Sequence, residues 1–341
     1  MIILWSMRVL LTGAAGFIGS FVARRLLDRG DEVIGFDNMN AYYDPALKEA
    51  RLRLLQQQSG FECVRGDITD QAALASAFDH ANATHVIHLA AQAGAGASIT
   101  DPARTIASNC VGTGHVLEEC RQRDIQHVVF ASSSSVYGLD RALPFSAHHG
   151  GDHPITMYGA TKRANELMAH TYSHLFQLPC TCLRFFTVYG PWGRPDMVLT
   201  KFVGAMLRGE VIQVLNHGQS TRDFTYVEDV AQVVVRVLDQ PAKTSALFNA
   251  SNHDPATSSA PFRIYNVACG KTVPLMHYLS VIEECLGVKA KIQMLPLQAG
   301  DVPDTTADVG DLERDFGFKP TTTVEVGVRN FVKWYREYYR V

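Results

Sequence analysis

A short apolar strand that runs directly into evenly spaced glycines most constrains how this chain can fold. Residues 8–11, Arg-Val-Leu-Leu, have the mainly apolar character of a buried parallel strand, and residues 17–29 then have the pattern of a helix ending at Gly30. The glycines between and within these segments are Gly13, Gly16 and Gly19. Such glycines allow a tight turn, close approach to a pyrophosphate and packing of the helix on its strand. Glycine triplets also serve helix packing alone, but this arrangement favours a dinucleotide site at the helix N-terminus.

The next expected strand, residues 31–37, ends in a carboxylate about 20 residues past the glycines. Asp37 can accept hydrogen bonds from the ribose of an adenosine, or it can be a solvated acid at a strand end. Because a carboxylate repels a 2′-phosphate, we expect the cofactor to be NAD rather than NADP. The other residues expected beside this cofactor are Phe17, Ile18, Asn38, Asp67, Ile68, Leu89, Ala90 and Ala91.

Strands and helices alternate as far as residue 190, which indicates an α/β fold with a doubly wound parallel sheet. We therefore expect an NAD-binding domain over residues 7–190, with some later segments returning to it. Beyond residue 190, loops rich in Gly, Pro and Asp separate short elements, so residues 191–339 are expected to form mainly a smaller substrate-binding α/β lobe. Residues 251–261 have the composition of a surface loop.

Composition excludes several classes of function. The 341 residues carry a net charge of −3 and no dense Lys/Arg run, which argues against nucleic acid as a partner. We expect no membrane association, because no apolar run approaches the roughly 18–20 residues of a membrane span, and the opening six residues are too short for a signal peptide. Seven scattered cysteines indicate reduced thiols in a cytoplasmic protein. The histidine groups lack the spacing of metal ligands, so we expect no metal site.

The candidate chemistry lies in a tyrosine and a lysine four residues apart. On a helix, Tyr158 and Lys162 share a face, where the ammonium can lower the phenol pKa from its usual value near 10. Such a pair can also belong to an ordinary amphipathic helix. Ser132–Ser135 follow an expected strand over residues 128–130, so their hydroxyls are expected in the crevice where ligands bind in such folds, although serines also occur in ordinary turns.

Taken together, these residues resemble the extended short-chain dehydrogenase/reductases, and within them the NAD-dependent sugar-nucleotide epimerases. The G-x-x-G-x-x-G spacing has the form found in that family, and the resemblance covers Met7 to about Tyr339. It is closest to the UDP-glucuronate 4-epimerase group. The shared segments are DNMNAYYDPALKEARL (37–52), HLAAQAG (88–94), ASSSSVYG (131–138), ANELMAHTYSHL (164–175), LRFFTVYGPWGRPDM (183–197), RDFTY (222–226) and GDVP (300–303).

The resemblance implies a role for each site residue. It makes Tyr158 the acid/base, Ser133 the hydrogen-bonding partner of the oxidised sugar oxygen, and Lys162 the residue that tunes Tyr158 and holds the nicotinamide ribose. It adds Asn109 to the cofactor site, and Thr187 as a hydroxyl donor to the sugar carboxylate. The substrate-binding residues that it implies are Ser133, Ser134, Ser135, Thr187, Arg194, Arg222, Gln298 and Asp301. Arg194 and Arg222 can also be solvated surface charges.

The expected activity is interconversion of UDP-glucuronate and UDP-galacturonate through transient C4 oxidation by bound NAD and a 4-keto intermediate. Sugar-nucleotide 4,6-dehydratases and UDP-glucuronate decarboxylases carry carboxylates where this chain has Ser134 and Ser135, which favours simple epimerisation. The chain departs from the group at Gly96 and Ala97, where the group has Arg and Tyr. A UDP-glucose/UDP-galactose 4-epimerase and a catalytically silent NAD-binding sensor protein are the alternatives.

In this family, two helices per subunit form a homodimer interface. The helices expected over residues 105–123 and 159–175 carry apolar residues on repeating faces, so we expect a homodimer. The alternative is that both helices simply cover the sheet.

Overall fold

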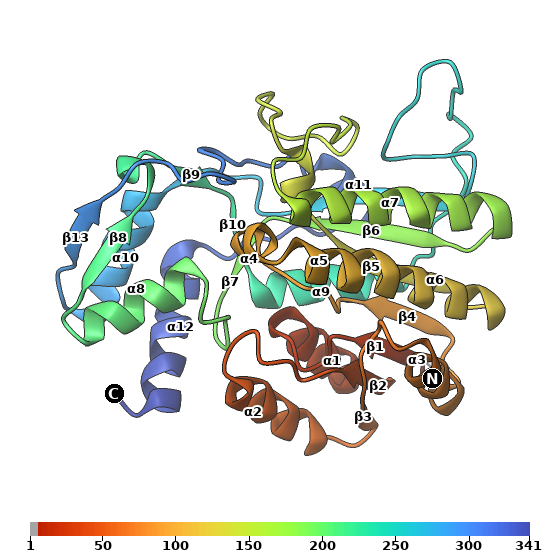
Figure 1. Ribbon diagram of the computed structural model, residues 1–341, viewed down its shortest axis with the longest axis horizontal. Coiled ribbons are helices and arrows are strands. Elements are labelled where there is room, and N and C mark those ends of the chain that lie inside the picture. Colours follow the sequence, from red (N-terminus) through yellow and green to blue (C-terminus); the bar gives the residue numbers. More distant parts are fainter. Residues whose placement is uncertain (1–5) are drawn as a thin grey trace.

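The computed structural model describes residues 6–341, which form a large parallel sheet covered by helices and a smaller lobe beside it (Figure 1). The seven sheet strands lie in the order β11-β6-β5-β4-β1-β2-β3, all parallel. They are β1 (Arg8–Thr12), β2 (Glu32–Asp37), β3 (Phe61–Arg65), β4 (His85–His88), β5 (His127–Ser133), β6 (Cys180–Phe185) and β11 (Phe262–Val267). Strand order reverses between β1 and β4, the place where ligands bind in such sheets. The predicted doubly wound α/β fold is confirmed.

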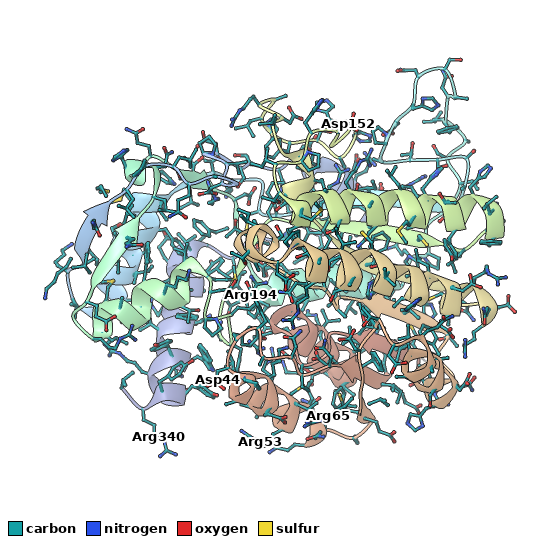
Figure 2. The ribbon with its side chains drawn as sticks, viewed as in Figure 1. Asp44, Arg53, Arg65, Asp152, Arg194 and Arg340 are labelled. Atoms are coloured by element: carbon teal, nitrogen blue, oxygen red, sulfur yellow. The ribbon has the colours of Figure 1, made fainter. Side chains whose placement is uncertain are left out.

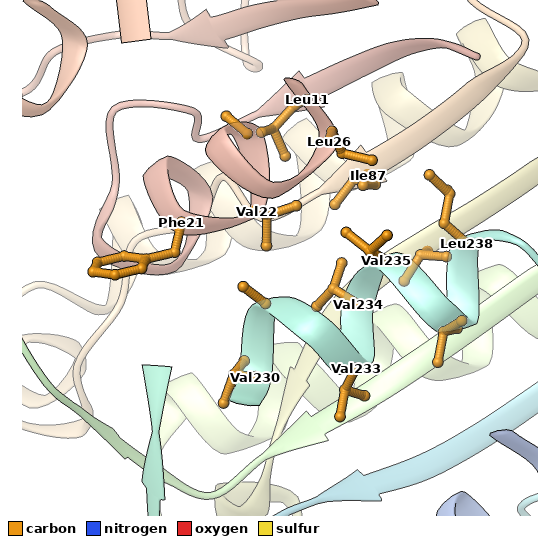
Figure 3. Close-up of a cluster of buried hydrophobic side chains, with 14 of the residues drawn as sticks. Leu11, Phe21, Val22, Leu26, Ile87, Val230, Val233, Val234, Val235 and Leu238 are labelled. Carbon is orange, nitrogen blue, oxygen red and sulfur yellow. The ribbon is translucent and has the colours of Figure 1, made fainter. Parts of the chain in front are cut away.

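Helices cover both faces of this sheet. One face packs against α1 (Phe17–Arg29), α2 (Pro45–Gln56), α9 (Val227–Leu238) and α11 (Gly310–Phe316). The other face packs against α3 (Gln71–Ala81), α6 (Gly112–Gln122) and α7 (Met157–Phe176). Figure 3 shows Val22 and Leu26 of α1 facing the valines of α9, beside Leu11 and Ile87 of the sheet. This core holds the glycine turn in a fixed place because α1 follows the turn directly.

The smaller lobe lies beside one end of the sheet, on the left of Figure 1. Its main elements are α8 (Val198–Leu207), β8 (Val211–Val214), α10 (Leu275–Leu286), β13 (Lys291–Met294) and α12 (Val324–Tyr339). A separate aromatic-rich core joins these elements. Short strand pairs lie between the lobe and the sheet: β7 (Thr187–Tyr189) with β10 (Phe224–Tyr226), and β9 (Thr221–Arg222) with β12 (Val273–Pro274).

Two local expectations need correction. Ser132 and Ser133 are the last residues of β5, not part of a loop after residue 130, because the ladder with β6 continues to Ser133 opposite Phe185. Only Ser134–Tyr137 form a separate 3-10 turn, η2. The helix expected over 105–123 is divided into α5 (Pro102–Ile106), a π-helical turn η1 (Ala107–Val111) and α6. Such turns widen a helix locally, and here η1 turns Asn109 into the interior.

The described residues also bear on the expectations about a membrane span, a metal site, the cysteines and the opening segment. Among residues 6–341, no helix has both the length and the apolar character needed to cross a membrane. Within the same residues, His, Cys, Asp and Glu side chains form no group that could hold a metal ion. The seven cysteines are free thiols, and Cys120, Cys180 and Cys182 are buried. Of the opening segment considered as a signal peptide, residues 1–5 lie outside the described part of the chain.

Candidate active site

A cavity of about 310 Å³ opens at the carboxyl ends of the central strands. One part of its wall is the turn between β1 and α1, and another is the end of β5 with the first turns of α7. The predicted residues that line it are Gly13, Gly16, Phe17, Ile18, Gly19, Asp37, Asn38, Ile68, Leu89, Ala90, Ala91, Ser133, Tyr158, Lys162 and Arg194. The cavity therefore joins the expected dinucleotide site to the expected catalytic residues.

The glycine turn forms a wall that side chains would fill. Gly13 has a φ of +75°, and a Cβ there would lie 2.7 Å from the Ala90 backbone nitrogen. A Cβ on Gly19 would lie 2.1 Å from the Gly13 carbonyl oxygen. Because Phe17 and Ile18 in the first turn of α1 are uncharged, the positive end of the helix dipole faces the cavity without a competing carboxylate. This cradle fits the pyrophosphate of a dinucleotide.

Asp37 closes the turn from the end of β2. Its two carboxylate oxygens accept hydrogen bonds from the backbone nitrogens of Ala15, at 3.1 Å, and Met39, at 2.9 Å. Each carboxylate oxygen retains a further lone pair, so Asp37 can also accept from a ribose hydroxyl. Asn38 donates to Asp67 at 2.7 Å, and Asp67 itself does not line the cavity.

Tyr158 and Lys162 lie on the first turns of α7, which Thr156 caps by accepting from the Gly159 nitrogen at 3.1 Å. The Lys162 ammonium is 6.0 Å from the centre of the Tyr158 ring and donates to the carbonyl of Ala131 at 2.8 Å. Burial lowers the pKa of Lys162 to about 8. The shared helix face expected from the spacing is therefore present.

Burial raises the pKa of the Tyr158 hydroxyl above its usual value, and the Arg194 cation and the Ser133 hydroxyl only partly offset that rise. The lowering expected from Lys162 is therefore not seen. Ser133, at the end of β5, also accepts from the Ser135 nitrogen at 3.2 Å. Arg194 thus acts on the phenol electrostatically, as a cation that the sequence spacing did not identify. Ser134 and Ser135 lie in η2, outside the cavity lining.

Arg194 lies near the middle of the molecule, between the large sheet and the smaller lobe (Figure 2). Its guanidinium makes two hydrogen bonds to Asp196, at 2.8 and 2.9 Å, and the Tyr42 hydroxyl donates to the same carboxylate at 3.3 Å. Tyr42 and Asp196 are functional neighbours that sequence reasoning missed. Tyr42 lies in the shared segment 37–52 and Asp196 in the shared segment 183–197, so the resemblance to the family could have identified both.

Arg51 is a third residue that the sequence did not single out. Only 2% of its surface is exposed, and its guanidinium donates to the carbonyls of Ala15, at 3.0 Å, and Trp192. It also donates to the Tyr43 hydroxyl at 2.7 Å. Arg51 therefore ties the glycine turn to the loop that carries Arg194.

The remaining predicted residues form two other groups. Asn109 is buried and accepts from the Gln92 nitrogen at 2.8 Å, so it shapes the cavity wall from behind. Arg222 donates to Asp301 at 2.8 Å, and the Asp301 nitrogen donates to the Gln298 carbonyl at 3.2 Å. This second group lies at the edge of the smaller lobe. Thr187, on β7, is half-buried and pairs with Phe224 of β10; it does not line the cavity, although its neighbours Phe186 and Val188 do.

The departure at Gly96 lies in the short helix α4 (Ala95–Thr100). A Cβ added at Gly96 would meet no atom of residues 6–341 within 4 Å. The backbone there therefore has room for a larger side chain.

Comparisons with known proteins agree with this geometry. The sequence profile of the NAD dependent epimerase/dehydratase family matches residues 9–268. A probable UDP-glucuronate 4-epimerase of Rhizobium meliloti is 45% identical over 335 residues, 98% of each chain. The crystal structure of a Bacillus cereus UDP-glucuronic acid 4-epimerase with UDP-glucuronic acid and NAD superposes with a TM-score of 0.85, at 28% identity over 98% of this chain and 100% of that one. A UDP-glucose 4-epimerase of Thermotoga maritima with UDP-glucose gives 0.84, at 26% identity over 98% and 100%.

Proposed function

Because the chain belongs to the NAD dependent epimerase/dehydratase family, we propose that it is a UDP-glucuronate 4-epimerase that interconverts UDP-glucuronate and UDP-galacturonate. The observation that carries this proposal is one cavity whose wall holds both the dinucleotide cradle and the Tyr158, Lys162 and Ser133 group. The identity to a relative of that name along almost the whole chain supports the choice of sugar.

NAD is the cofactor of this family, and the cradle fits it. Gly13, Gly16 and Gly19 would hold its pyrophosphate, Asp37 its adenosine ribose, and Lys162 its nicotinamide ribose. When bound, NAD accepts a hydride from the substrate carbon C4 and returns it. We assign residues 7–190, with the returning segments α9, β11 and α11, to the NAD-binding half, and residues 191–339 mainly to the UDP-sugar.

The chain's own residues move the proton. Tyr158 as a phenolate would take the proton of the C4 hydroxyl, and Ser133 would hydrogen-bond the same oxygen while it becomes a ketone. The resulting 4-keto sugar would rotate within the cavity while its UDP stays bound at the lobe, by Arg222 on the diphosphate and Asp301 on the uridine ribose. Once C4 has the opposite configuration, Tyr158 would return the proton to the C4 oxygen.

The site favours a uronic acid as the substrate, and it favours epimerisation over elimination as the reaction. The turn after Ser133 carries Ser134 and Ser135, which supply hydrogen bonds but no carboxylate to act as an additional base. Thr187, between the lining residues Phe186 and Val188, would donate to the sugar carboxylate, and Arg194, which lines the cavity, would attract that group. Without a further acid or base, reversal of the oxidation is the expected outcome.

The direct test is incubation of the purified protein with UDP-glucuronate, followed by separation of the C4 epimers. UDP-galacturonate should form until the two sugars reach equilibrium. A parallel incubation with UDP-glucose tests the neutral-sugar activity of the Thermotoga maritima neighbour. Faster turnover of UDP-glucose would replace the proposal with a UDP-glucose 4-epimerase, and no turnover of either sugar would favour a silent NAD-binding protein.

The substitution Thr187→Val tests recognition of the carboxylate. A hydrogen bond to a charged group contributes about 1.5–3 kcal/mol, so kcat/KM for UDP-glucuronate should fall roughly tenfold to a hundredfold. Thr187→Ser keeps the hydroxyl and should retain most of the activity. Turnover of UDP-glucose, which has a neutral hydroxymethyl group there, should change much less. Equal losses on both sugars would mean that Thr187 shapes the cavity without reading the charge.

Cofactor choice gives a second prediction. Since like charges in close contact cost several kcal/mol, Asp37 should make the protein prefer NAD over NADP by about a hundredfold or more. Protein denatured directly after purification should release NAD, identified by chromatography. Equal affinity for NADP would show that Asp37 does not face the ribose.

We also propose a cytoplasmic homodimer. Exposed apolar side chains on adjacent helices support the dimer: Ile106 is 41% exposed, Val111 is 49% exposed, and Leu167 of α7 is 54% exposed. Free thiols fit a reducing compartment. Light scattering should give twice the 37.6 kDa chain mass, and a single-chain mass at micromolar concentration would contradict the dimer.

A further inference from the structure

A buried carboxylate that the proposed reaction does not use lies directly behind the catalytic residues. Glu166, on α7, is 1% exposed. One of its oxygens accepts from the Ser132 hydroxyl at 2.6 Å, and its two oxygens together pair with the Arg184 guanidinium at 2.8 and 2.9 Å. Arg163 donates to it from the same helix at 3.1 Å. Leaving a carboxylate buried is unfavourable unless it is paired in this way.

Glu166 and Lys162 hold consecutive residues of one strand. They lie four residues apart on α7 and therefore share a face. Lys162 binds the carbonyl of Ala131, and Glu166 binds the hydroxyl of Ser132. Ser133 is the next residue and ends β5. One helical turn thus fixes the strand end that presents Ser133, while its preceding turn presents Tyr158.

We propose that Glu166 is a positioning residue for the proposed epimerase reaction: by binding Ser132 it holds the end of β5, and with it Ser133, in place beside Tyr158, and its carboxylate shares the face of α7 that carries the Lys162 ammonium. The expected effect on turnover rests on the proposed function. The expected effect on the titration of Lys162, the electrostatic part, does not depend on which sugar the protein uses.

The charges around Lys162 give the direction of the effect. Burial lowers its pKa, whereas Cys110 of η1 and Glu166 raise it. Tyr158 faces it from the same helix, and His88 of β4 is kept neutral by burial, with its pKa lowered to about 3. The groups that face Glu166 are Arg163, Arg184, Ser132, Cys182 and Tyr137. Loss of the Glu166 charge therefore lowers the Lys162 pKa further, and less of the lysine is charged at neutral pH.

The experiment compares Glu166→Gln with the double variant Glu166→Gln/Arg184→Gln in the full-length protein with its cofactor. The double variant removes the buried Glu166–Arg184 pair together and leaves Arg163 with Asp152, at 3.8 Å, so the positioning of Ser133 can still be tested if the single variant fails to fold. Lys162 is titrated by NMR of protein labelled at the lysine side-chain nitrogens, and its signal is assigned by its loss in Lys162→Met. In parallel, the pH profile of UDP-glucuronate turnover is recorded.

The Lys162 midpoint should fall in Glu166→Gln and should change little in the double variant, because that variant removes the Arg184 cation together with the Glu166 anion. In Glu166→Gln the alkaline limb of the pH profile should shift to lower pH by the same amount as the midpoint, so that turnover near pH 8 falls several-fold. In the double variant turnover should fall at every pH, because Ser132 has lost its carboxylate acceptor. Arg163→Gln, which removes a partner of Glu166 but leaves its charge, should keep the wild-type midpoint.

Wild-type turnover at every pH in the double variant would overturn the inference, because Ser133 would then be held in place without Glu166. An unshifted Lys162 midpoint in the single variant would overturn it equally. The NMR titration needs no sugar, so a protein inactive on UDP-glucuronate that still shows the Lys162 shift would refute the proposed function and leave the electrostatic part standing.

Discussion

Replacing Tyr158 by phenylalanine is expected to lower turnover of UDP-glucuronate by roughly two orders of magnitude or more, the usual effect of removing a general base. The ring stays in place, so the fold and the bound NAD should be retained. The hydroxyl is lost from a cavity whose burial raises the pKa of Tyr158, and in which the Arg194 cation and the Ser133 hydroxyl partly offset that rise. Steady-state rates and the NAD released on denaturation measure the two outcomes separately.

Tyr42→Phe is the matched control. It removes a hydroxyl from the same cavity wall, but Arg194 still holds Asp196 through two hydrogen bonds. Its effect on turnover should therefore be much smaller. Near wild-type turnover in Tyr158→Phe would remove Tyr158 from its proposed role and require another base in the cavity.

The second large effect is expected from Gly19→Ala. The added methyl group would lie 2.1 Å from the Gly13 carbonyl oxygen, a backbone atom that cannot move without opening the turn. We expect the purified protein to contain little or no NAD and to lose nearly all activity. The cofactor content per chain, measured after denaturation, checks this directly.

Gly114→Ala controls for the general cost of a methyl group on a helix. The new Cβ would meet only the flexible end of Met168, at 3.3 Å. NAD content should stay near the wild-type value. A Gly19→Ala protein that still carries stoichiometric NAD would show that the turn relaxes around the methyl group. Close packing at Gly19 would then no longer support the turn as the pyrophosphate site.

Features set by neighbours in the sequence were predictable. The glycine turn follows from a strand, three glycines and a helix within residues 8–29, and Tyr158 and Lys162 share a face because a helix repeats every 3.6 residues. The strand end at Ser133 was misplaced. Serines favour turns locally, but here the ladder to β6 extends the strand, and this tertiary pairing outweighs local preference.

Contacts between distant segments were not predictable from one sequence. Tyr42 and Asp196 are 154 positions apart, and Arg222 and Asp301 are 79 apart. Neither pair belongs to a periodic pattern, so only the folded chain brings them together. The same applies to Arg194, whose influence on Tyr158 depends on how the loop after β7 folds back over the sheet.

The hydrogen bonds that Arg51 makes to two loops constrain any attempt to re-engineer the sugar preference of this protein. Its guanidinium holds the Ala15 carbonyl in the cofactor turn and the Trp192 carbonyl in the sugar-side loop at the same time. A loop grafted from a relative must therefore present a carbonyl at the position of residue 192, or a buried cation loses a partner. Libraries that vary the loop should keep this backbone point fixed, because a graft selected for a new sugar would otherwise lose its cofactor as well.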